Sequence, residues 1–287
     1  MSIHPTAIID PTAEIGAGVE IGPYSVIGPH CQVGEGSKIW SNATLQGYTK
    51  LGKNCQVSPG AVLGGFPQDL KFKGEESWVV VGDNTVIREC VTLNRASGEG
   101  QETVVGSNCL LMAYAHVAHN CHVGNEVIMA NSVQLGGHVE VGDFAFIGGM
   151  SVFHQHIRIG KLAIISGFSA ARQDIPPFAM ADNRPAFIVG LNKVGLKRRG
   201  FDLSARTRLK RAFQLLFFSG MNFKQAIETI QDEIQDDLHV DELIAFVQSS
   251  ERGIYRPNRV LRGAIDELSS PSATSLEPLS NTLVETP

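Results

Sequence analysis

Aliphatic residues recur at every sixth position along much of the chain. A step of six residues from Ile3 meets an aliphatic side chain each time until Leu63. The same spacing resumes at Val81 and, after a second interruption, continues with hydrophobic residues to Ile165. A small or slim side chain, such as Ala43, usually stands four residues further on. Each block of six therefore carries two positions that suit a narrow interior.

This period predicts a mostly β fold, a parallel β-helix of triangular section. Each hexapeptide forms one short strand and one corner, and three hexapeptides complete a coil. Glycine serves those corners that need a positive φ or a close backbone approach. Four of the five cysteines fall on the small position, which favours packing over a disulfide framework. They are Cys31, Cys55, Cys109 and Cys121.

The repeat has two interruptions and an end. Residues 64–77 and 94–103 break the period, and insertions in a solenoid loop outward, where binding residues commonly lie. We expect residues 1–190 to form the β-helix domain. Amphipathic stripes, one of them behind an Asn222 cap, predict a helical domain over residues 191–265. Residues 266–287 are rich in Ser, Pro and Thr, which predicts a disordered tail.

Composition and charge exclude several classes of protein. The net charge of −5 argues against a general nucleic-acid binder. We expect a cytoplasmic protein without an integral membrane segment, because no signal-peptide pattern opens the chain and no apolar run approaches the roughly 18 residues of a membrane span. Residues 193–211 are strongly basic. Such a run is either a solvated helix face or a site for phosphates or an acidic partner.

Columns of residues can be derived from the coil geometry. Residues 18 apart lie above one another at about 4.8 Å, the spacing of paired strands. One predicted column holds His119, Gly137 and Gln155, and the next holds Asn120, His138 and His156. An imidazole that titrates near neutrality can take a proton from a hydroxyl, and a glycine N–H beside it can donate to an oxyanion. Acyl transfer from a thioester needs both elements.

The histidine spacing argues against a metal site. His116 and His122 occupy equivalent positions on successive faces, and three extended residues span roughly 10 Å, whereas zinc ligands all lie about 2 Å from the ion. Only ligands from a neighbouring chain could evade this limit. We expect no metal and no other cofactor. Isolated exterior histidines are usually solvated or packed between subunits, and we expect this of His122, His4 and His30.

Six segments give the chain a resemblance to a known family. They are QDLKFKGE (68–75), AHVAHN (115–120), LGGHV (135–139), GGMSVFHQ (148–155), DIPPF (174–178) and GLNKVGLKRRGF (190–201). Over residues 1 to about 260 the chain resembles the UDP-N-acetylglucosamine O-acyltransferases, acyl-carrier-protein-dependent enzymes that begin lipid A biosynthesis. The resemblance implies a left-handed β-helix and a homotrimer with active sites between subunits. It also implies acyl carrier protein and UDP-N-acetylglucosamine as partners.

The resemblance assigns roles to individual residues. It makes His119 the general base that removes the proton of the glucosamine 3-hydroxyl, and the Gly137 N–H the oxyanion donor. Gly167 aligns with the position that limits acyl-chain length, where a glycine leaves the groove open for a longer hydroxyacyl chain. The other implied contacts orient the substrate (His116, His138, His154, Gln155), hold the sugar nucleotide (Asp69, Lys71) and lie on the nucleotide side (Asn192, Arg198, Arg199).

The chain departs from some relatives at positions that bear on the preferred acyl chain and sugar. Asn120 follows the base where some relatives carry Asp, so no carboxylate adjoins His119. Val194 replaces a Glu, His156 a Phe, and residues 182–186, which include Pro185, replace a segment similar to GNHA.

Two other functions stay open. One is an N-acyltransferase that acts on an amino-sugar nucleotide, and the other is a trimeric solenoid scaffold that has lost catalysis. The joint presence of His119, Gly137, Asp69 and Lys71 weighs against the scaffold, because a scaffold needs none of them together.

Overall fold

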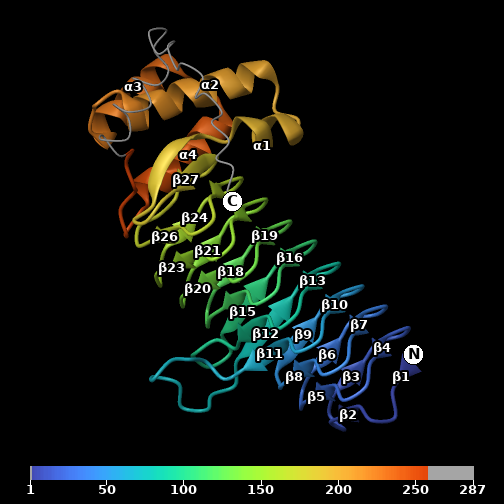
Figure 1. Cartoon of the computed structure of the whole chain (residues 1–287). Helices are drawn as coiled ribbons and strands as arrows, with labels where there is room; N and C mark the ends of the chain where they lie inside the picture. Colours follow the sequence, from blue (N-terminus) through green and yellow to red (C-terminus); the bar gives the residue numbers. More distant parts are fainter. Residues whose placement is uncertain (1, 258–287) are drawn as a thin grey trace, which may run out of the picture.

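The protein is a three-sided coil of short strands with helices at one end (Figure 1). The computed structural model describes residues 2–257. The predicted tail over residues 266–287 and the end of the predicted helical domain lie outside the described residues.

Three sheets form the sides of the coil, with every third strand in the same sheet up to β26. The first sheet contains β1 (Ser2–Ile3), β4 (Glu20–Ile21), β7 (Lys38–Ile39), β10 (Gln56–Val57), β13 (Val86–Ile87), β16 (Leu110–Leu111), β19 (Ile128–Met129), β22 (Phe146–Ile147), β25 (Ile164–Ile165), β27 (Ala179–Asp182) and β28 (Phe187–Leu191). The second contains β2 (Ile8–Ile9), β5 (Val26–Ile27), β8 (Thr44–Leu45), β11 (Val62–Gly65), β14 (Thr92–Asn94), β17 (His116–Val117), β20 (Gln134–Leu135), β23 (Val152–Phe153) and β26 (Ala170–Ala171). The third contains β3 (Glu14–Ile15), β6 (Gln32–Val33), β9 (Thr49–Leu51), β12 (Trp78–Val81), β15 (Glu102–Val105), β18 (His122–Val123), β21 (Glu140–Val141) and β24 (Arg158–Ile159).

The strand register confirms the predicted columns. In the second sheet, His116 pairs with Gln134 and Gln134 pairs with Val152, each 18 residues on. All strand pairs are parallel except β27 with β28, which forms an antiparallel hairpin. The six-residue period therefore specifies both the strands and their vertical alignment.

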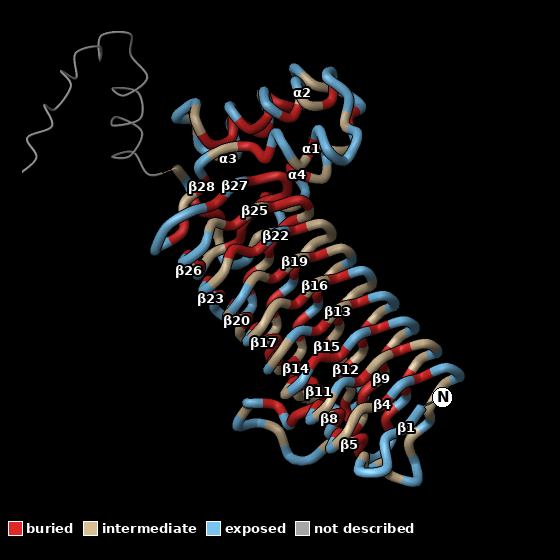
Figure 2. The backbone as a smooth tube through the Cα atoms, turned by 45° about the vertical axis from the view of Figure 1, so that its right-hand side comes forward, coloured by how far each residue is buried: buried red, intermediate tan, exposed pale blue. Residues whose placement is uncertain are grey.

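The core consists of the two inward positions of each hexapeptide. Leu45, Leu111 and Ile147 are fully buried, as are the small residues Ala43 and Cys55. Figure 2 shows the buried stretches on the inside of successive coils and the exposed ones at their corners. The first coil is the exception, because it has no coil below it and leaves Ile3 41% exposed.

Glycine plays a narrower part at the corners than the sequence suggests. Positive φ is carried mostly by other residues, for example Asn42 at 58° and Asn54 at 53°, since asparagine tolerates the left-handed region. The glycines that follow the aliphatic position instead allow close packing between coils. A Cβ added to Gly22 would lie 2.8 Å from the backbone nitrogen of Ser41 in the next coil.

Helices follow the hairpin as the amphipathic stripes predict. They are α1 (Lys193–Arg198), α2 (Leu203–Phe213), which continues into a π-helical turn (Gln214–Phe218), α3 (Phe223–Glu233) and α4 (Leu238–Gln248). Asn222 begins α3 with a capping box that it forms with Gln225. None of the helices within residues 2–257 has the length and apolar character needed to cross a membrane.

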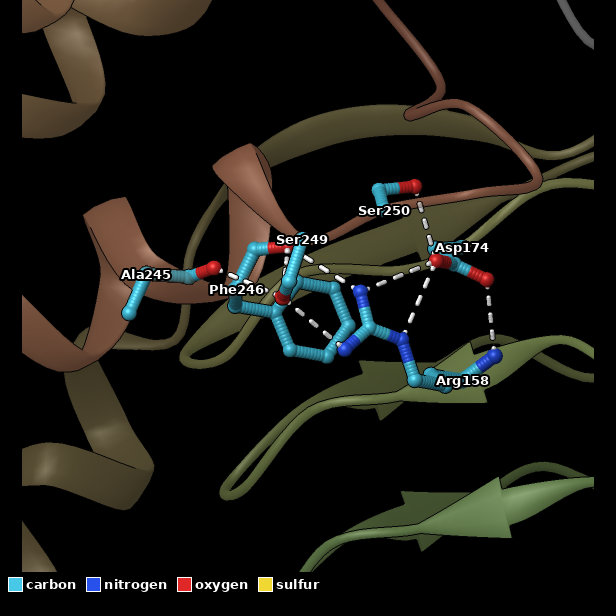
Figure 3. Close-up of polar contacts among 6 residues, drawn as sticks. All are labelled: Arg158, Asp174, Ala245, Phe246, Ser249 and Ser250. Carbon is cyan, nitrogen blue, oxygen red and sulfur yellow. Dashed lines mark hydrogen bonds and ion pairs between the residues drawn. The ribbon is translucent and has the colours of Figure 1, made fainter.

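A polar network around the Arg158–Asp174 ion pair attaches the end of α4 to the last coils (Figure 3). Arg158 on β24 donates from its backbone and its guanidinium to Asp174, whose side chain is 1% exposed. The guanidinium also donates to the Phe246 carbonyl at 3.1 Å and stacks over the Phe246 ring at 4.4 Å. Ser249 and Ser250 complete the network. This clamp fixes the segment after α4 beside the upper coils.

Candidate active site

His119 and Gly137 lie one above the other at the corner between the second and third sheets. His119 follows β17, Gly137 follows β20, and the His138 N–H donates to the His119 carbonyl at 3.0 Å. A Cβ added to Gly137 would lie 2.5 Å from Nε2 of His119. The imidazole therefore occupies the space that any side chain at position 137 would fill. This juxtaposition confirms the predicted column.

Asn120 determines which ring nitrogen of His119 carries the hydrogen. Its Oδ1 accepts from the Ser97 N–H at 2.9 Å and its Nδ2 donates to the Ser97 carbonyl at 3.0 Å, so the amide has one orientation. The same Oδ1 lies 2.9 Å from Nδ1 of His119. Because an amide oxygen can only accept, Nδ1 holds the hydrogen in the neutral ring and Nε2 keeps its lone pair. The free lone pair is thus on the nitrogen beside Gly137.

Two further imidazoles adjoin His119. His138 meets His119 edge-on, with ring centroids 5.2 Å apart, and stacks on His156 at 4.4 Å. Burial lowers the pKa of His138, and the neighbouring His156 and His119 lower it further. His138 is therefore biased toward its neutral form, which can donate from one nitrogen and accept at the other. Within residues 2–257, no group of three His, Cys, Asp or Glu side chains is arranged to hold a metal ion.

His116 lies on the outer side of the second sheet, below Gln134. Its Nδ1 is 2.7 Å from the Thr92 hydroxyl, and burial, with a smaller contribution from His119, lowers its pKa. His154 receives a 3.0 Å contact at Nδ1 from Arg252, which follows α4. These residues border a groove of about 440 Å³. The groove is lined by Gln68, His116, Ala118, His119, Gln134, Leu135, Gly136, Gly137, Val152, Phe153, His154 and Gln155.

The first inserted loop brings Asp69 and Lys71 toward this groove. Figure 1 shows the loop projecting from the coil between β11 and β12. The backbone N–H of Lys71 donates to Asp69 at 3.0 Å and lowers the pKa of that carboxyl, and Ser97 and His119 act in the same direction. Asp69 is therefore an ionised acceptor near His119, and Lys71 is exposed beside it.

Within one chain, the residues expected on the nucleotide side lie at another corner. Arg199 pairs with Glu126 at 2.7 Å and stacks over Phe144 at 3.9 Å, at the corner between the third and first sheets. Asn192 is 3% exposed, caps α1 through Gly195 and donates to the Leu162 carbonyl at 2.8 Å. Arg198 ends α1 and is exposed.

Gly167 lies at the third corner, between the first and second sheets. A Cβ added there would lie 3.2 Å from the Gly149 carbonyl oxygen, and the neighbouring Phe168 is 52% exposed. The predicted residues thus form a cluster around His119, a second group that contains Arg199, and the separate Gly167.

The sequence reasoning missed three contributors to the His119 cluster. Thr92 and His116 pair directly across the second sheet, although they are 24 residues apart and not 18. The second insertion lies between them, so the 18-residue column rule does not reach across it. A 24-residue offset would have found Thr92. Ser97 and Arg252 lie outside the repeat and had no sequence signal.

Known proteins share this architecture. A family model described as bacterial transferase hexapeptide matches residues 30–65 and 102–137. A second, described as UDP N-acetylglucosamine O-acyltransferase domain 2, matches residues 174–255. The fold and these two matches therefore define a hexapeptide-repeat transferase with a left-handed parallel β-helix.

Whole-length relatives give the particular family. The chain is 46% identical over 255 residues to the acyl-[acyl-carrier-protein]–UDP-N-acetylglucosamine O-acyltransferase of Thermodesulfovibrio yellowstonii, covering 88% of this chain and 99% of that one. It matches the structure of LpxA from Acinetobacter baumannii with a TM-score of 0.86 at 41% identity, covering 89% of this chain and 100% of that one. It matches LpxA, a UDP-N-acetylglucosamine acyltransferase from Bacteroides fragilis, with a TM-score of 0.87 at 38% identity, covering 88% and 100%. The chain belongs to the acyl-[acyl-carrier-protein]–UDP-N-acetylglucosamine O-acyltransferase family, which confirms the resemblance.

Proposed function

We propose that the protein transfers a 3-hydroxyacyl chain from acyl carrier protein to the 3-hydroxyl of UDP-N-acetylglucosamine, the first step of lipid A biosynthesis. Membership of the family supports this reaction. The observation that carries it is the oriented base: Nδ1 of His119 is held by Asn120, and Nε2 lies free beside Gly137. An inactive scaffold would not need this arrangement.

The chemistry follows from those atoms. Nε2 of His119 takes the proton of the sugar 3-hydroxyl as its oxygen bonds to the thioester carbonyl carbon. The carbonyl oxygen becomes an oxyanion, which the Gly137 N–H stabilises, since that N–H has no acceptor within residues 2–257. The tetrahedral centre then breaks its bond to sulfur, and the imidazolium returns the proton to the departing thiolate. His116, His138, His154 and Gln155 border the sugar, and Asp69 and Lys71 hold the sugar nucleotide.

A homotrimer would bring the separated groups together. The base and Arg199 lie at different corners of one chain, so a site that uses both needs two chains. A row of outward residues on the first sheet also changes from polar to apolar above the first insertion. The polar members are Glu20, Lys38 and Gln56, and the apolar ones are Val86, Leu110, Ile128, Phe146 and Ile164. This apolar row is suited to contact with another subunit. In such a trimer, Asn192 would fix the start of α1 so that Arg198 and Arg199 face the diphosphate of the neighbouring site.

The basic stretch divides into paired and free cations. Arg199, Arg208 and Arg211 form ion pairs with Glu126, Asp237 and Glu233. The side chains of Lys193, Lys197, Arg198, Arg206 and Lys210 have no ion-pair partner within residues 2–257. Apart from Arg198, these free cations are available to the acidic carrier protein, and a carrier-protein partner supports the proposal of a cytoplasmic enzyme.

The test is mass spectrometry of the products formed from UDP-N-acetylglucosamine and a ladder of 3-hydroxyacyl and simple acyl carrier proteins. We expect one acylated sugar nucleotide, with a long hydroxyacyl chain favoured because glycine at position 167 leaves room for the acyl chain. A parallel assay uses the matching 3-amino sugar nucleotide as acceptor. If only that acceptor is acylated, N-acyl transfer replaces the proposal. No product with either acceptor from an intact trimer would favour the scaffold.

A further inference from the structure

Arg95 is a buried cation without an acidic partner. It follows β14 in the second insertion, is 5% exposed and forms no ion pair within the described residues. Its Nε has no hydrogen-bond partner there. Its guanidinium carbon instead lies 4.8 Å from the Tyr48 ring centroid, 5.3 Å from Phe66 and 5.5 Å from Phe72. Three aromatic rings thus surround a charge that has left water.

Such an arrangement needs a structural reason. Burial lowers the pKa of Arg95, because moving a cation out of water disfavours its charged form. Cation–π attraction to several rings offsets part of that cost and is strongest where the cation is desolvated. The same attraction restrains the rings, because it holds them around the guanidinium. Phe66 and Phe72 belong to the first inserted loop, so Arg95 holds that loop.

Hydrogen bonds join the same two insertions. The Arg95 N–H donates to the Gly65 carbonyl at 2.8 Å, and Asn94 Nδ2 donates to the Phe66 carbonyl at 2.6 Å. Further along, the Gly98 N–H donates to Glu75 Oε1 at 2.8 Å. The second insertion therefore contacts the first at its start and near its end, with the Arg95 guanidinium between.

The anchored loop carries the residues expected to hold the sugar nucleotide. Asp69 and Lys71 stand between Phe66 and Phe72, the two loop residues that stack on Arg95. We propose that Arg95 is a positioning residue that fixes the loop presenting Asp69 and Lys71 to the nucleotide sugar, a role that rests on the proposed function. The insertion that bears Arg95 also bears Ser97, which orients Asn120 and through it His119. One insertion thus aligns both the nucleotide loop and the base.

Two kinds of measurement test this role. Arg95→Met removes the cation, and the double variant Phe66→Leu with Phe72→Leu removes two rings while keeping Arg95. We expect each to raise the KM for UDP-N-acetylglucosamine about tenfold and to leave the KM for acyl carrier protein unchanged. Arg95→Lys keeps the charge without the planar group, and its KM for UDP-N-acetylglucosamine should fall between the values of the wild type and Arg95→Met. Arg256→Met is the matched control, because it removes an exposed cation–π pair with Phe223 at the start of α3, outside both insertions.

Limited trypsin digestion provides a readout that does not depend on activity. We expect cleavage after Lys71 and Lys73 to accelerate about tenfold in Arg95→Met and in the double phenylalanine variant, and to stay at the wild-type rate in Arg256→Met. Wild-type cleavage rates and an unchanged nucleotide KM in both variants would overturn the role. The role would also be overturned if kcat and both KM values worsened together and the melting temperature fell, because Arg95 would then serve general stability. Faster cleavage in a protein that acylates no sugar nucleotide would contradict the proposed function while leaving the loop anchor in place.

Discussion

The coils below the first insertion and those above it share one interior but differ outside. Leu45 below and Leu111 above are equally buried at the same place in the repeat. Outside, the lower coils carry exposed pairs such as Lys38 with Glu20, whereas the upper coils carry the His119 cluster. The inward positions therefore build the frame, and the outward positions determine its chemistry. Substitutions outside should change activity without unfolding the frame, unless they touch a buried charge.

Gly137→Ala should separate activity from stability. The added methyl would lie 2.5 Å from Nε2 of His119, so the imidazole must move. A displacement of about 1 Å at a reacting group can lower the rate 10²-fold, and we expect a loss of that order in kcat. Gly190→Ala is the control, because its Cβ meets nothing within 4 Å. Equal turnover in the two variants would show that the ring is not held against Gly137 during catalysis.

Arg158→Met should test an outward residue of the upper coils whose contacts are structural. It leaves Asp174, with a side chain 1% exposed, without its cation, and breaking such a pair costs about 3 kcal/mol. Lys38→Met in the lower coils breaks a pair that is about half exposed and should cost less than about 1 kcal/mol. Urea unfolding measures both. A similar small loss for the two variants would mean that the clamp does not stabilise the upper end.

Asn120→Asp should produce the smallest change, a shift of the pH–rate profile. The substitution keeps the oxygen that accepts from His119 Nδ1 but adds a negative charge, which favours the imidazolium. We therefore expect the acid limb of kcat/KM to move about one unit to higher pH, with little change on the plateau. An unmoved limb would indicate that another group controls it.

The sequence predicts the regular coils well and the inserted loops poorly, for a physical reason. A column such as His119 with Gly137 follows from counting, because each coil has the same length. The contacts of Ser97 with Asn120 and of Arg95 with Phe66 join loops outside the count. The separation of Arg199 from His119 also follows only from the folded corners. Repetition transmits register along the chain, and an insertion interrupts it.

The most direct test of the account is the turnover of His119→Ala beside His122→Ala. The two histidines lie on the same coil, but only His119 adjoins Gly137. We expect kcat to fall about 10²- to 10⁴-fold in His119→Ala and to stay near the wild-type value in His122→Ala, with equal melting temperatures and oligomeric states. Wild-type turnover in His119→Ala would contradict the assignment of the base and, with it, the division between frame and chemistry.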